Sequence, residues 1–159
     1  MKRRMTVELL NGSEKASLYS ISFEVDGTTE FEKFVVEFET NATYNRDYQR
    51  IIAALQAILR IGALERFFRP EGKFNDSVQA LPIESGRLRL YCLRLSDQIV
   101  ILGNGGVKTT RTYEEDKRLY GYVLDLQKFE RILNESIAKG LVSIEERELS
   151  GVEDMTFDI

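Results

Sequence analysis

The feature that most constrains this chain is a pair of apolar segments separated by a short polar turn. Residues 87–94 read RLRLYCLR and residues 98–103 read QIVILG. Both segments are rich in branched and aromatic side chains, which favour strands. Ser96 and Asp97 lie between them and are typical turn residues. Two strands this close in sequence pair as an antiparallel hairpin, which we expect at the centre of a sheet.

Periodic patterns elsewhere predict further strands and three helices. Strands are predicted over residues 6–10, 17–25 and 78–83. Apolar residues three and four apart predict helices that begin near residue 29, span residues 48–59, and span residues 122–137. Capping boxes are predicted at two pairs: Thr29 with Glu32, and Thr112 with Glu115.

Strands and helices are segregated along the chain more than they alternate. This order predicts an α+β fold with a mainly antiparallel sheet and helices packed on one face. A length of 159 residues suits one domain over residues 1–159. We expect a strand and helix extension at its N-terminal side and a helix near its C-terminal side.

The chain contains no histidine and one cysteine, Cys92. These counts exclude a Ser-His-Asp triad, a Cys-His pair, a histidine-ligated metal and a multi-cysteine metal site. Acid–base chemistry must therefore use carboxylates, lysine or tyrosine, with arginine as an electrostatic partner. No apolar run approaches membrane-spanning length, and no signal-peptide core follows the basic N-terminus. We expect a cytoplasmic protein without metal, cofactor or membrane attachment.

The net charge of −4 hides an uneven distribution along the chain. Residues 60–111 contain nine basic and five acidic residues, which gives +4, whereas residues 140–159 contain one basic and six acidic residues, which gives −5. The basic middle can bind an anion or a phosphate backbone. The acidic tail, residues 141–159, is expected to be a solvated, flexible end; the alternative is that it shields the basic middle.

Alternation along the first strand of the hairpin separates its arginines from its leucines. Arg87, Arg89 and Tyr91 fall on one face, and the leucines at 88 and 90 fall on the other. If the leucines face the core, two guanidiniums and a phenol project from an open sheet face. There they can hold a phosphodiester and stack on a base. The alternative is an ordinary solvent-exposed polar face.

A glycine-rich segment, GNGGVK, ends in Lys108 and follows the second strand. It departs from a phosphate-binding P-loop because Val107, not glycine, precedes the lysine. We expect instead a tight turn that places Lys108 and Arg111 beside the strand face.

Residues 48–118 resemble part of the RelE/ParE toxin superfamily, particularly its HigB-like and phage-derived toxin-like branches. The motifs are LRLYCL at residues 88–93 and QIVILGNGGVK at residues 98–108, after an amphipathic helix and a basic segment. Arg89 falls on the strand arginine of that pattern and Lys108 on its loop lysine. Gly103 stands where the HigB-like branch often has histidine. The resemblance implies a RelE-like fold with a toxin-like core over about residues 17–140.

The resemblance also implies the toxin of a bacterial type II toxin–antitoxin pair, with an antitoxin protein as partner. RelE-like members cut mRNA on the ribosome, whereas ParE-like members inhibit DNA gyrase. We expect a metal-independent endoribonuclease (an mRNA interferase). Arg89 and Arg87 would stabilise the phosphate, Lys108 would act as base or acid, and Tyr91 would stack or assist. Contacts that position nucleic acid are expected from a second set: Arg66, Arg69, Lys73, Arg111 and Tyr113.

Three alternatives stay open on the sequence alone. One is a non-catalytic module of toxin-like fold that binds a partner protein. Another is a ParE-like gyrase inhibitor, and the third is a structural or mobile-element protein without enzyme activity. The overall acidity of the chain departs from ribosome-dependent toxins, which are usually basic.

Overall fold

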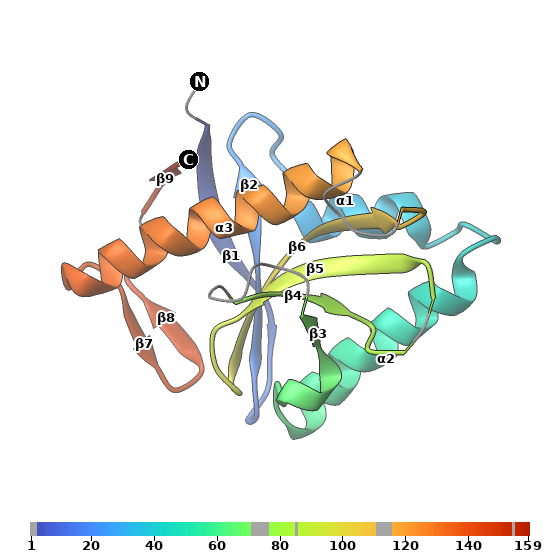
Figure 1. Cartoon of the computed structure of the whole chain (residues 1–159). Helices are drawn as coiled ribbons and strands as arrows, with labels where there is room; N and C mark the ends of the chain where they lie inside the picture. Colours follow the sequence, from blue (N-terminus) through green and yellow to red (C-terminus); the bar gives the residue numbers. More distant parts are fainter. Residues whose placement is uncertain (1–2, 71–76, 85, 111–115, 154) are drawn as a thin grey trace.

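The computed structural model describes residues 3–70, 77–84, 86–110, 116–153 and 155–159 (Figure 1). Its helices are α1 (Glu30–Phe38), α2 (Asn45–Ile61), the 3-10 helix η1 (Glu65–Phe67) and α3 (Lys117–Ala138). Its strands are β1 (Arg4–Gly12), β2 (Ser17–Phe23), β3 (Arg69–Pro70), β4 (Val78–Leu81), β5 (Leu88–Arg94), β6 (Ile99–Val107), β7 (Ser143–Glu145), β8 (Glu148–Ser150) and β9 (Phe157–Asp158).

Seven of the described strands form one sheet in the order β3–β4–β5–β6–β2–β1–β9, and β7 pairs with β8 in a separate hairpin. Neighbouring strands are antiparallel except β2 and β6, which run parallel from Ser17 opposite Ile99 to Ser20 opposite Leu102. The predicted hairpin is confirmed as β5 and β6 and lies inside this sheet. The fold is therefore α+β with a mostly antiparallel sheet, as the sequence predicts.

The expectation that all helices pack on one face is wrong, because helices cover both faces of the sheet (Figure 1). Leu90 and Cys92 pack with buried residues of α1 and α2, whereas Tyr91 and Leu93 pack with buried residues of α3. The predicted alternation along β5 is thus correct, but both sets of side chains are buried. A strand that reads as a nearly continuous apolar run is typical of burial on two faces.

The acidic tail is not a flexible end. Residues 143–150 form the β7–β8 hairpin, and β9 pairs with Arg4 and Met5 of β1. Leu149, Val152 and Phe157 are almost completely buried in the same core cluster as α3. The tail packs on the N-terminal side of the sheet because these three apolar residues, spaced among the acids, need a partner surface.

The expected tight turn at residues 103–107 is also wrong, since β6 continues as a strand through all three glycines to Val107. A β carbon on Gly103 would lie 3.0 Å from the side chain of Leu126, and one on Gly106 would lie 3.1 Å from that of Leu119. Both leucines belong to α3. The glycines therefore permit a close approach between helix and sheet, which is one established use of glycine inside a strand.

A β-bulge bends β6 at its middle. The register shifts between Leu90 and Cys92, so that Tyr91 stands opposite both Gly103 and Asn104. Pairing of β6 with β2 ends at Leu102, just before the bulge. The beginning of α1 contacts the second half of β6 beyond that point. Bulges commonly end pairing and redirect a strand in this way.

Candidate functional site

The solvent-facing end of the β5–β6 hairpin brings together two of the predicted catalytic residues. Arg87 directly precedes β5 and Lys108 directly follows β6. The Lys108 backbone N–H donates to the Arg87 carbonyl oxygen at 2.7 Å, so the two residues are cross-strand neighbours. Arg87 is exposed and Lys108 is half-buried. Two cations that lie side by side at a strand end can share one phosphate group.

The first turn of α2 fixes the backbone at this end of the hairpin. Asp47 Oδ2 accepts hydrogen bonds from the backbone N–H groups of Arg87 at 3.0 Å and Leu88 at 3.2 Å. A β carbon on Gly86 would come within 2.7 Å of the same carboxylate. The sequence Gly86-Arg87-Leu88 thus suits a chain that must pass close to a helix before it enters the sheet.

Arg89 does not lie on an open face. Its side chain is buried, with the residue only 5% exposed, and its Nη1 donates to the carbonyl oxygens of Gly86 at 2.7 Å and Leu88 at 3.1 Å. These two bonds tie the Arg89 guanidinium to the chain on either side of Arg87. This arrangement is that of a positioning group, because two backbone carbonyls accept from its Nη1 and little of the residue is exposed.

Tyr91 is fully buried, at 0% exposure, in the core cluster beneath α3. The expectation that Tyr91 projects from an open sheet face is therefore wrong. The cause is α3 itself, which contacts both β5 and β6. Stacking on a base would require α3 to leave the sheet.

Of the residues expected to position nucleic acid, Arg66 lies far from Arg87. Arg66 is exposed on η1, which follows the end of α2, whereas Arg87 is held at the start of α2. A helix of 17 residues separates these two ends by about 25 Å. Arg69 uses its Nη2 to hold the carbonyl oxygens of Ile83 at 3.0 Å and Glu84 at 3.2 Å. Lys73, Arg111 and Tyr113 lie outside the described residues, as does the Thr112–Glu115 capping box.

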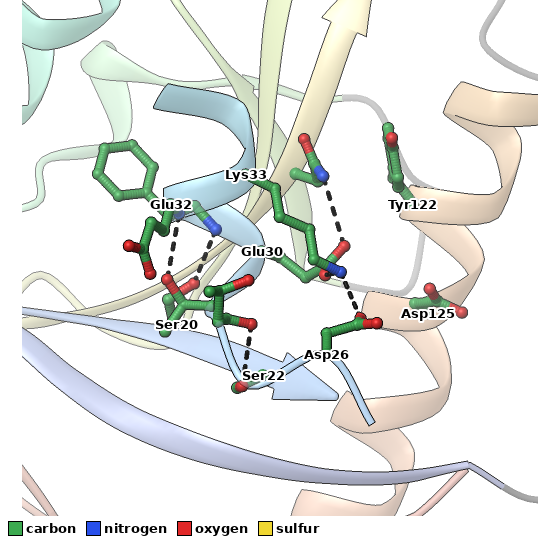
Figure 2. Close-up of polar contacts among 12 residues, drawn as sticks. Ser20, Ser22, Asp26, Glu30, Glu32, Lys33, Tyr122 and Asp125 are labelled. Carbon is green, nitrogen blue, oxygen red and sulfur yellow. Dashed lines mark hydrogen bonds and ion pairs between the residues drawn. The ribbon is translucent and has the colours of Figure 1, made fainter. Parts of the chain in front are cut away.

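A second polar cluster, not predicted from the sequence, lies where α1 meets β6 and α3. Glu30 is only 5% exposed, and its Oε2 lies 2.6 Å from Lys33 Nζ. Asn104 Nδ2 donates to Glu30 Oε1 at 3.5 Å, while Asn104 Oδ1 accepts from the Gly105 N–H at 2.7 Å. Figure 2 shows Glu30 and Lys33 facing Asp26, which also pairs with Lys33. The cluster fastens the start of α1 to the bulge of β6.

Asp125 of α3 borders this cluster on its far side (Figure 2). Burial raises the pKa of Asp125, its ion pair with Arg3 opposes that rise, and the nearby Glu30 carboxylate adds to it. Tyr122, one turn earlier on α3, accepts a hydrogen bond from Arg118 Nε at 2.9 Å, and Arg118 also pairs with Glu37 of α1. These contacts link α1, α3 and the N-terminal strand through charge pairs.

The sequence carried a weak signal for this second cluster. Glu30 directly follows Thr29, whose side chain caps α1 as predicted by accepting from the Glu32 N–H at 3.1 Å. Acids in a first helical turn are ordinarily solvent-exposed. The bulge that draws Asn104 inward was not visible in the sequence, because GNGG is equally typical of a turn.

Among the described residues, no group of three or more His, Cys, Asp or Glu side chains is arranged to hold a metal ion. None of the described helices is both long and apolar enough to cross a membrane. Cys92 is buried, and burial raises the pKa of its thiol. A thiol in that state is not a nucleophile.

No family model, curated protein or solved structure matches the chain.

Proposed function

We propose that the chain is a toxin of the RelE/ParE kind, with a RelE-like fold, that acts on RNA through Arg87 and Lys108. The observation that carries this proposal is the backbone pairing that places these two cations side by side at the hairpin end. The order of the described elements supports the fold assignment. After α2 come η1, the antiparallel strands β3 to β6 and the charged helix α3.

The chemistry assigned to this pair follows from RNA cleavage by a 2′-hydroxyl. The reaction needs a base, stabilisation of the negative phosphorane, and a proton for the leaving 5′-oxygen. Arg87 supplies charge stabilisation through its guanidinium. Lys108 supplies the proton transfer, for which acid–base groups contribute about 10²–10⁴ in rate. Arg89 acts as a positioning residue, and Tyr91 takes no part while α3 covers it.

Controlled induction in a bacterial host tests this proposal. We expect wild type to arrest growth and to produce new RNA ends, and the double variant Arg87→Ala/Lys108→Ala to do neither. The matched control is Arg131→Ala/Lys139→Ala, which also removes one arginine and one lysine, both exposed on or next to α3. This control should arrest growth like wild type. Circular dichroism melts of all three proteins show whether each is folded.

Two results contradict the ribonuclease proposal. If the Arg87→Ala/Lys108→Ala protein is folded and still cuts RNA, the assigned residues are wrong. If wild type arrests growth with DNA damage signalling and intact RNA, the gyrase-directed alternative is correct.

A non-catalytic protein-binding module is the second candidate, and the burial of Arg89 and Tyr91 favours it. In such a module the arginine and tyrosine of β5 stabilise the core, and the surface binds a partner protein without catalysing a reaction. This candidate predicts normal growth and intact RNA after induction of wild type. A partner protein that co-purifies with wild type should then also co-purify with the Arg87→Ala/Lys108→Ala variant.

A further inference from the structure

A groove lies between the β1–β2 hairpin of the sheet and the separate β7–β8 hairpin. It has a volume of about 480 Å³ and is bounded by β1 and β2 on one side and by β7, β8 and the residues around them on the other. Its apolar lining comes from Val7 and Leu9 of β1 and Leu149 of β8, among others. Its described lining contains no residue of β5 or β6, so the groove is separate from the proposed ribonuclease site.

Glutamates dominate the charge around this groove. The described lining contains Glu145, Glu146, Glu148 and Glu153 against one cation, Arg147. That cation is already engaged, because Arg147 Nη1 donates to the Glu14 carbonyl oxygen at 2.7 Å. Four carboxylates around an apolar lining favour a ligand that presents cationic groups beside apolar ones.

One border of the groove is an open strand edge. Among the described residues, β9 pairs only with Arg4 and Met5, so β1 has no outer partner from Thr6 onward. On the edge of β1 away from β2, Arg3 exchanges backbone hydrogen bonds with Ile159. On the edge that faces β2, the Arg4 carbonyl oxygen accepts from the Glu24 N–H. Alternation along the strand therefore turns the N–H and C=O groups of Val7 and Leu9 to the outer edge.

The open edge has little of the usual protection against pairing: one exposed charge, Glu8, and a bulge that begins only after Leu9. Leu9 is 59% exposed and Leu10 is 38% exposed, and residues 6–10 contain neither lysine nor proline. Edge strands are ordinarily protected by lysine, proline or a cover. A bulge at Leu10 interrupts the pairing with β2 only beyond Leu9. An edge of this kind suits an added strand.

A strained glutamate lies on the rim of the groove. Glu146, in the turn between β7 and β8, has a φ of 55°, a left-handed conformation that favours glycine or asparagine. A non-glycine residue in that conformation carries a cost that is commonly tolerated at binding sites.

We propose that the groove and the open edge of β1 together bind an extended, basic segment of another protein by strand addition. Backbone N–H and C=O groups of the segment pair with Val7 and Leu9. Side chains on one face of the segment are apolar and lie along the groove, and lysine or arginine side chains reach the glutamates on the rim. Main-chain pairing then gives affinity, and the alternating side chains give selectivity.

The test uses the full chain and a synthetic probe, a capped peptide of about ten residues in which lysine and valine alternate, a length sufficient for one strand. Titration by NMR or calorimetry should show saturable binding, and amide hydrogen exchange at Val7 and Leu9 should slow in the complex. A peptide of the same sequence with an N-methyl group on every backbone amide keeps the charge but has no N–H left to pair along either edge. We expect it to bind at least about tenfold more weakly.

Charge variants test the rim. Glu145→Gln/Glu148→Gln/Glu153→Gln should weaken lysine–valine binding by about tenfold or more. The matched control carries the same charge change at three exposed glutamates outside the groove, as Glu32→Gln/Glu39→Gln/Glu135→Gln, and should bind like wild type. Glu146→Gly should bind more weakly and yet keep or raise the melting temperature, which separates a binding loss from a folding loss.

Three outcomes overturn the proposal. One is binding of the lysine–valine peptide weaker than about 1 mM, since that is the range of non-specific attraction. Another is equal binding of the N-methylated peptide, which would reveal electrostatic adsorption without strand addition. The last is a dimer in analytical ultracentrifugation that Leu9→Lys abolishes, since a second copy of the chain would then be the occupant. None of these variants touches Arg87 or Lys108.

Discussion

The guanidinium of Arg89 is held by the carbonyl oxygens of Gly86 and Leu88, and almost none of the residue reaches solvent. A buried carbonyl that loses a charged donor costs free energy, because water cannot replace the donor at once. Arg87, two positions earlier in the chain, is exposed. Substitutions of these two arginines therefore compare the effect on stability of a buried and an exposed guanidinium at one place in the fold.

We predict that Arg89→Met lowers the free energy of unfolding by about 2–3 kcal/mol, because the apolar stem is kept while the donor to two carbonyls is lost. Arg87→Met should change that free energy by no more than about 0.5 kcal/mol, as is usual at exposed sites. Urea denaturation of both variants measures the difference. Equal effects of the two substitutions would show that Arg89 has no positioning role.

At the scale of elements, the contact between α3 and β6 determines which side chains of β5 can reach solvent. The glycines of β6 let α3 lie close to the sheet, and Leu126 and Leu119 fill the space that side chains would occupy. Gly105 differs from its neighbours, since a β carbon there would lie 1.8 Å from the backbone oxygen of Arg89. Backbone atoms of a paired strand have little freedom to move aside.

We predict that Gly105→Ala lowers the free energy of unfolding by about 3 kcal/mol or more through this clash. Gly121→Ala is the matched control, because Gly121 lies inside α3 and a β carbon there meets nothing within 4 Å. That control should raise stability by about 1 kcal/mol, as alanine replaces glycine in a helix interior. Thermal unfolding of the two variants should give shifts of opposite sign.

The longer elements were predictable from local patterns, whereas the short strands β3, β7, β8 and β9 and the packing of the elements were not. Alternation along β5 and the cap at Thr29 depend on near neighbours in the sequence, and both are confirmed. The side of the sheet that α3 covers depends on contacts across the whole chain. The role of the glycines at 103–106 was not predictable either, because a close helix approach and a tight turn require the same residue type. Arg89 was placed on the correct face, but that face is covered.

At the scale of the whole molecule, one charge pair connects the N-terminal side of the sheet to α3. Arg3 pairs with Asp125, whose pKa burial raises above its usual value. A carboxyl with a raised pKa binds its proton more tightly in the folded state than in the unfolded state. It therefore adds stability as the pH falls toward its unfolded pKa, and that stability is lost as the pH rises through the folded pKa.

We predict that the difference in free energy of unfolding between wild type and Asp125→Asn moves in favour of wild type as the pH is lowered from about 7 to about 4. Arg3→Met removes the guanidinium that opposes the rise in the pKa of Asp125. In the Arg3→Met background, the stability difference caused by Asp125→Asn should therefore change at higher pH. Urea denaturation across the pH range measures both. A difference that stays constant with pH would contradict the buried, raised state of Asp125.

The parallel pairing of β2 with β6 has a consequence for how the chain is made. Ser20 donates its hydroxyl hydrogen to the carbonyl oxygen of Leu102, a partner 82 positions later, and all seven residues of β2 are buried in the finished fold. A ribosome that adds about 5–20 residues per second takes on the order of ten seconds to reach that partner. During that interval the nascent β1–β2 hairpin has no sheet to join, and its apolar side chains are exposed to chaperones.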